Sequence, residues 1–149
     1  RNLTLLSTFF RLTSIIILCV IALCHYAALF FLGGTDYLTV FDSNQLDALA
    51  LLSIKLHGAG YNISLLFFGV HLIFLGYLIY KSKLFARVLG ILLLIGGICY
   101  ITNSVTWFLF PTFVKMIYPG ILIPCSIGEL LFSIWLLIKG VRTKKQEQQ

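Results

Sequence analysis

Residues 57–80 read HGAGYNISLLFFGVHLIFLGYLIY, an almost wholly apolar run that carries two histidines, His57 and His71. The run is long enough to cross a bilayer as an α-helix, because about 20 apolar residues span the hydrocarbon core. In such a helix His57, Ser64 and His71 fall on roughly one stripe, since they are spaced seven residues apart. A titratable side chain is costly at this depth, so we expect the rest of the chain to pack around this helix.

The composition of the whole chain indicates that its solvent is lipid. Of its 149 residues, 60% are hydrophobic and only 11% are charged, whereas about a quarter are charged in soluble domains. The formal charge of +6 comes from basic residues at the ends of apolar runs, with no basic face that alternates with aromatic residues. We therefore expect the lipid bilayer, and not a nucleic acid, as the partner.

Four apolar runs predict four transmembrane helices in a single domain over residues 1–149. The expected spans are residues 12–32, 58–80, 87–110 and 119–138. Pro111 is expected to stop the third span, and residues 112–118 are expected to form a short loop. A polar tail over residues 139–149 follows the last span. The predicted fold class is all-α, an integral membrane antiparallel helical bundle.

The distribution of basic residues predicts the orientation of this bundle. Nine lysines and arginines fall on the side that holds both ends of the chain, whereas Lys55 and Lys115 fall on the other side. Cytoplasmic loops carry the excess of such residues, so we expect a cytoplasmic C-terminus. His57 and Lys55 are then expected at the outer interface, where Lys55 can extend its ammonium group to water.

Small residues predict where the helices approach one another. Gly69 and Gly76 are seven residues apart, as are Gly90 and Gly97. Such spacing places small side chains on one face, which allows close contact between helices in lipid.

Depth counts bring several polar residues to one layer of the bundle. Glu129 is the one acidic residue inside a predicted span and lies about ten residues into the fourth span. His71 lies at a similar depth in the second span, and His25 and Asn103 lie somewhat nearer the outer side. Such groups usually face a bundle interior and pair, so we expect a candidate polar site. Its residues are His71, Glu129, His25, Asn103, Ser64, Ser126 and Ser133.

The sequence leaves three functions open for this site. A buried pair of His71 and Glu129 can relay a proton or hold a ligand, which favours proton-coupled or small-solute transport or sensing. Alternatively, the pair only fixes helix packing, and the protein is a membrane scaffold or a subunit of a complex. A third alternative is a membrane redox protein that uses a haem or a quinone, with His25 and His71 as ligands.

Other chemistry finds no support in the sequence. No nucleophile elbow, dinucleotide-binding motif or phosphate-binding loop is present, so the chain is not expected to be an enzyme and no catalytic residue is assigned. The histidines do not occur at the spacing of a metal site, so neither a metal nor another cofactor is predicted.

Several stretches together resemble a known family. These are Arg1-Asn2-Leu3 with Phe10-Arg11-Leu12, LDALALLSIKLHGAGYNISLLFFGVHLIFLGYLIYKS at 46–82, LFARVLGILLLIGGICYITNS at 84–104 and IGELLFSIWLLIKGV at 127–141. In order and extent they resemble the multi-pass bacterial membrane proteins known as domain of unknown function 4386. The resemblance implies a bacterial cytoplasmic membrane protein, but it implies no activity.

The resemblance also implies a longer parent protein of about six helices. About two further N-terminal helices would precede Arg1 and pack beside this segment. Assembly into a homo-oligomer or a larger membrane complex remains open on the sequence alone.

Overall fold

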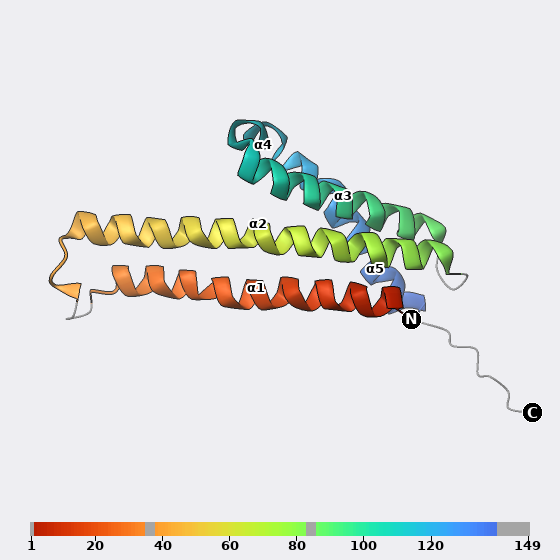
Figure 1. Ribbon diagram of the computed structural model, residues 1–149, viewed down its shortest axis with the longest axis horizontal. Helices are drawn as coiled ribbons and strands as arrows, with labels where there is room; N and C mark the ends of the chain where they lie inside the picture. The colour runs from red at the N-terminus through yellow and green to blue at the C-terminus, as the bar shows by residue number, and fades with distance from the viewer. Residues whose placement is uncertain (1, 35–37, 83–85, 140–149) are drawn as a thin grey trace, which may run out of the picture.

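The structure is a computed structural model that describes residues 2–34, 38–82 and 86–139. Its elements are α1 (Asn2–Leu32), α2 (Ser43–Lys81), α3 (Arg87–Leu109), α4 (Pro111–Ile117), the 3₁₀ helix η2 (Gly120–Leu122) and α5 (Ile123–Lys139). The long helices α1 and α2 lie antiparallel, α3 packs on α2, and α5 packs on α3 (Figure 1). The described residues contain no β-strand, and the predicted all-α membrane bundle is confirmed.

Four segments are long and apolar enough to cross a membrane, namely α1, α2, α3 and Gly120–Lys139, which joins η2 to α5. α1 begins ten residues before its predicted span and therefore includes Arg11. The 39 residues of α2 extend about 58 Å at 1.5 Å per residue, almost twice the hydrocarbon thickness. One part of α2 must therefore extend beyond the hydrocarbon. Of the predicted polar tail, Lys139 ends α5 and residues 140–149 lie outside the described residues.

α2 begins at a capping box. The Gln45 backbone nitrogen donates to Asp42 Oδ1 at 2.9 Å, and the Asp42 backbone nitrogen donates to Gln45 Oε1 at 3.1 Å. These two bonds satisfy amide groups that the first turn of a helix leaves without partners. The cap lies well before the predicted span, so the helix starts before its apolar run does.

The predicted loop over residues 112–118 is wrong, because most of it forms the short helix α4. α3 ends at Leu109, before Pro111, as the sequence predicts. Pro111 then occupies the first turn of α4, where its fixed φ suits a helix and its missing N–H leaves no bond unmade. One proline therefore both stops α3 and starts α4.

Glycines let α2 and α3 meet backbone to backbone. A Cβ added to Gly69 would lie 2.8 Å from Gly97 O, and one added to Gly97 would lie 2.6 Å from Gly69 O. Gly76 and Gly90 meet in the same way, with each added Cβ 2.7 Å from the opposite carbonyl oxygen. The close contact that the seven-residue spacing predicts is confirmed at both pairs.

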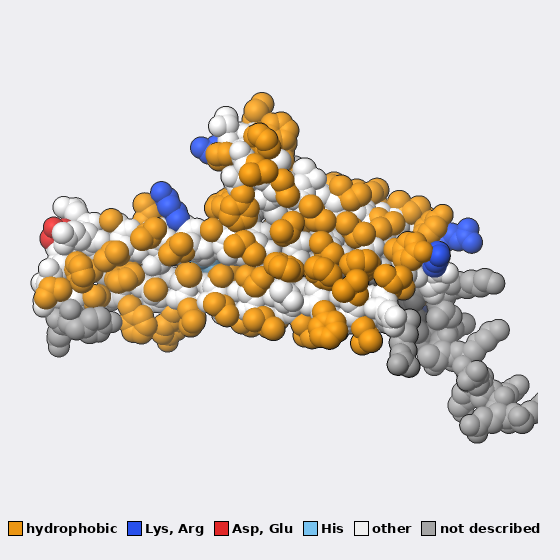
Figure 2. All heavy atoms as spheres, viewed as in Figure 1, with side chains coloured by type: hydrophobic (Ala, Val, Ile, Leu, Met, Phe, Trp, Pro, Cys, Tyr) orange, Lys and Arg blue, Asp and Glu red, His pale blue; other side chains and the backbone are white. Residues whose placement is uncertain are grey.

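Large apolar side chains remain on the outside of the bundle. A small core of Leu72, Ile79, Leu89 and Leu93 is buried, whereas Leu137 in α5 is 86% exposed. Hydrophobic side chains cover most of the face in Figure 2, and Lys and Arg side chains appear at a few positions near its edges. An apolar exterior of this extent matches a lipid solvent.

Replacing Gly97 with alanine is predicted to destabilise the bundle. Its Cβ would push against Gly69 O and the Ile73 side chain, and such overpacking typically costs about 1–3 kcal/mol. Thermal unfolding of the purified protein in detergent measures the change. Gly58→Ala is the matched control, because an added Cβ there meets nothing within 4 Å. An equal melting temperature for Gly97→Ala and Gly58→Ala would contradict the packing of α2 on α3.

Candidate functional site

The stripe of His57, Ser64 and His71 packs against α1. His57 Nδ1 lies 3.2 Å from Ile21 O. Ser64 Oγ lies 2.9 Å from Ser14 Oγ and donates to Ser14 O at 3.0 Å. The contacts on α1 recur every seven residues, like the stripe on α2, so the two antiparallel helices stay in register along their shared length.

His71 is held by Ser7 of α1. Its Nδ1 lies 2.9 Å from both the hydroxyl and the carbonyl oxygen of Ser7, and Ser7 Oγ also donates to His71 O at 3.3 Å. Because a carbonyl oxygen can only accept, the contact with Ser7 O requires a proton on Nδ1. Nε2 is then the ring nitrogen that remains for another partner.

Phe68 connects His71 to an arginine on α1 and a tyrosine on α3. The Arg11 guanidinium carbon lies 4.5 Å from the Phe68 ring centroid, a cation–π distance. Phe68 stacks on His71 at 5.9 Å between centroids and packs against Tyr100 at 5.4 Å. Three helices thus bring a cation, an imidazole and a phenol to one cluster.

Glu129 of α5 lies beside this cluster and is half-buried. Its carboxyl group interacts with the Tyr100 hydroxyl and with the charge of Arg11. Glu129 Oε1 is buried and has no hydrogen-bond partner among the described residues. A buried acceptor without a partner is costly, so this atom is a candidate point of contact for a proton or a ligand.

His71 and Glu129 belong to a wider cluster of polar side chains. His71 bonds to Ser7, Glu129 interacts with Tyr100, and the Arg11 charge acts on both. Depth counts matched the two residues but carried no information on which side of its helix each one faces. They also missed Arg11 as a site residue, because the predicted span began at residue 12. The interruption of an apolar run by this arginine is the signal that could have identified it.

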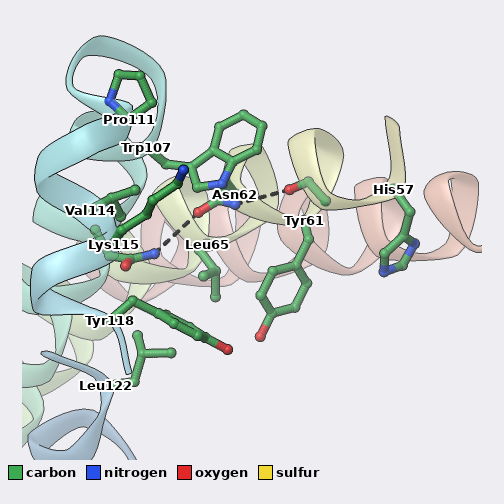
Figure 3. A pocket seen from close by; sticks show the side chains of 12 residues that line it. His57, Tyr61, Asn62, Leu65, Trp107, Pro111, Val114, Lys115, Tyr118 and Leu122 are labelled. Atoms are coloured by element: carbon green, nitrogen blue, oxygen red, sulfur yellow. Dashed lines mark hydrogen bonds between the residues drawn. The ribbon is translucent and has the colours of Figure 1, made fainter. Parts of the chain in front are cut away.

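Two asparagines link α2 and α3 nearer to α4. Asn103 Nδ2 donates to Asn62 Oδ1 at 3.1 Å, and Asn62 Nδ2 donates to Gly58 O at 2.9 Å. Both asparagines line a pocket of about 640 Å³ between α2, α3, α4 and η2. Figure 3 shows Lys115, Trp107, Tyr61 and Tyr118 around this pocket. It is therefore a second polar region, distinct from the cluster around Glu129.

The chain matches the family described as Domain of unknown function (DUF4386) over residues 1–140. It belongs to this family. An uncharacterized protein of Archaeoglobus fulgidus is 34% identical over 83 residues, which are 53% of this chain and 45% of that relative. The chain thus spans less than half the length of this relative. No solved structure matches it.

The remaining predicted site residues of this DUF4386 chain do not form one layer. Asn103 pairs with Asn62, nine residues along α2 from His71. His25 is exposed, and its ring centroid lies 3.9 Å from that of His57. Ser126 and Ser133 are exposed on α5. The expected single layer is therefore wrong, since its members are spread along the bundle.

His25 and His71 do not lie close enough to bind one haem in this DUF4386 chain. His71 contacts Ser7, which is 18 residues from His25 on the same helix, or about 27 Å at 1.5 Å per residue. Axial ligands must both reach one iron, so the proposed pair does not fit a shared haem. The described residues also contain no group of three or more His, Cys, Asp or Glu side chains placed to hold a metal ion.

A double-mutant cycle on Ser7 and His71 is predicted to show coupling of about 1 kcal/mol. Ser7→Ala removes the hydroxyl that contacts His71 Nδ1 and His71 O, and His71→Leu removes the ring. The stability of the two single variants and the double variant is measured by thermal unfolding in detergent. Thr8→Ala with His71→Leu is the control, because the exposed Thr8 bonds only to its own helix at Thr4 O. Equal coupling in both cycles would contradict the Ser7–His71 contact.

Proposed function

We propose that this chain binds or moves a proton or a small solute through a polar site centred on Glu129. The observation that carries the proposal is the Glu129 carboxyl group, which lies on a membrane-spanning helix. Its Oε1 is buried and has no hydrogen-bond partner among the described residues. Ionisable groups inside membrane helices are costly and commonly belong to substrate pathways or proton relays.

The surroundings of Glu129 suit both of its protonation states. The apolar environment is the larger influence on the carboxyl group, and it favours the neutral form. The positive charge of Arg11 favours the ionised form. The Tyr100 hydroxyl can donate to a carboxylate or accept from a carboxylic acid. It can therefore keep a hydrogen bond to Glu129 in either protonation state. A group placed between such opposing influences can take up and release a proton.

Polar side chains continue from Glu129 in both directions. Tyr61 interacts electrostatically with Tyr118 and with Glu129, and both tyrosines line the pocket beside α4. On the other side, the Arg11 charge acts on Glu129 and on His71. These electrostatic interactions support a route for a proton along the bundle, with Glu129 near its centre.

The charge bias of the sequence supports an orientation for this route. Basic residues gather at the Lys81 end of the bundle, which would face the cytoplasm. The pocket beside α4 would then lie on the outer side of a bacterial cytoplasmic membrane.

Glu129→Gln is predicted to lower proton movement across vesicle membranes at least tenfold, because glutamine keeps the shape of the side chain but cannot exchange a proton. Purified protein is reconstituted into lipid vesicles that contain a pH-sensitive dye. A pH step outside the vesicles then reports proton entry as a change in dye signal.

The control is Ser126→Ala on the same helix, because Ser126 is exposed and bonds only to Leu122 O of its own segment. This variant should move protons like the unaltered protein. Equal proton entry with and without the Glu129 carboxyl group would overturn the proposal. If Glu129→Gln changed only the melting temperature, the site would serve packing, as in a membrane scaffold.

A further inference from the structure

The pocket between α2 and α4 has the dimensions of a ligand site. Its volume of about 640 Å³ lies within the range of about 300–1,000 Å³ that is usual for small-molecule pockets. Four elements contribute to its wall, so it is a partly open pocket between packed helices and not a depression on the surface of one helix. Glu129, the centre of the proposed proton site, does not line it.

Hydrogen bonds fix the direction of the two amides in this pocket. Gly58 O can only accept, so the nitrogen of Asn62 must face it. Asn62 Oδ1 then faces Asn103 and accepts from its Nδ2. This leaves Asn103 Oδ1, which is buried and has no partner among the described residues, on a side chain only 4% exposed. The wall of the pocket thus includes an amide whose oxygen still lacks a hydrogen-bond donor.

Lys115 brings a positive charge to the same pocket. It is exposed and lies in the last turn of α4. Its side chain lines the pocket (Figure 3). No ion pair joins it to another residue that the structure describes. An ammonium group in this position can bind an anionic group of a ligand.

Aromatic and apolar side chains form the remaining wall. Trp107, Tyr61 and Tyr118 line the pocket together with Leu65 and Leu122. Tryptophan and tyrosine are enriched at the depth of lipid headgroups, where one end of the side chain is apolar and the other is wet. The composition of the wall is therefore typical of the depth at which the headgroup of a lipid joins its acyl chains.

We propose that this pocket binds the headgroup of an anionic phospholipid that carries a free hydroxyl group. The phosphate lies at Lys115, the hydroxyl donates to Asn103 Oδ1, and the glycerol backbone and first acyl carbons contact the aromatic wall. A single molecule of this class supplies the anion, the donor and the apolar part that the pocket requires. The proposal does not depend on proton exchange at Glu129.

Trp107 provides the signal for a direct test. The chain has two tryptophans, so Trp135→Phe leaves Trp107 as the one fluorescent indole. The full chain with this substitution is titrated in an uncharged detergent with short-chain phosphatidylglycerol. Phosphatidylmethanol has the same charge but no free hydroxyl, and is expected to bind about fivefold more weakly, the effect of one hydrogen bond. Phosphatidylcholine, which has no net charge, should bind still more weakly.

Lys115→Gln tests the site of the phosphate. It is expected to weaken phosphatidylglycerol binding about tenfold, as the loss of a hydrogen bond to a charged group does. Lys55→Gln is the matched control, because it removes one exposed lysine from the same molecule outside the pocket. Both lysines are exposed, so neither change should impair folding.

Three results would overturn the proposal. The first is equal binding of phosphatidylglycerol and phosphatidylcholine. The second is an equal loss of affinity in Lys115→Gln and Lys55→Gln, which would indicate attraction by overall charge. The third is binding of free glycerol phosphate as tightly as of the short-chain lipid, which would assign the pocket to a soluble phosphate ester.

Discussion

Close packing at small residues on two faces of α2 is the constraint on which the remaining structure depends. Toward α1, α2 presents Ser64 and Gly60, and a Cβ on Gly60 would overlap the Ile21 side chain. Toward α3, it presents Gly69 and Gly76. In lipid the hydrophobic effect does not drive helices together, so packing at such small residues and hydrogen bonds between helices must do so. His71, Ser64 and Asn62 are each positioned by one of these two contacts.

The two faces also explain how the polar residues are distributed. Residues 57, 64 and 71 lie on one stripe of α2, and residues 62, 69 and 76 lie on another, roughly 150° away around the helix. His71 therefore faces α1 and Asn62 faces α3, although both belong to one span. The α5 side chain Glu129 reaches the cluster by way of Tyr100 on α3. The ionisable side chains of this cluster are thus spread over neighbouring helices.

The sequence predicted the elements well and their lateral arrangement poorly. Apolar runs and prolines located the four membrane helices, and glycine spacing identified both contacts between α2 and α3. Residue counts measured depth along a helix but not the direction in which a side chain points, which depends on the partner helix. The counts therefore matched His71 and Glu129 in depth, but they gave no sign that Ser7, an ordinary serine in an apolar run, contacts His71. Arg11 was misplaced because a helix can extend beyond its most apolar part.

The sequential packing of the helices has a consequence for how the protein folds. The main contacts join α1 to α2, α2 to α3, and α3 to α5, so each long helix packs chiefly on its predecessor. In this respect the chain is similar to a repeat array, in which stability is a sum over nearest neighbours. When a helix is inserted, the helix on which it packs is already in the membrane, so packing does not require later segments of the chain. The bundle can therefore assemble in the order of synthesis, with each helix packing on the one before it.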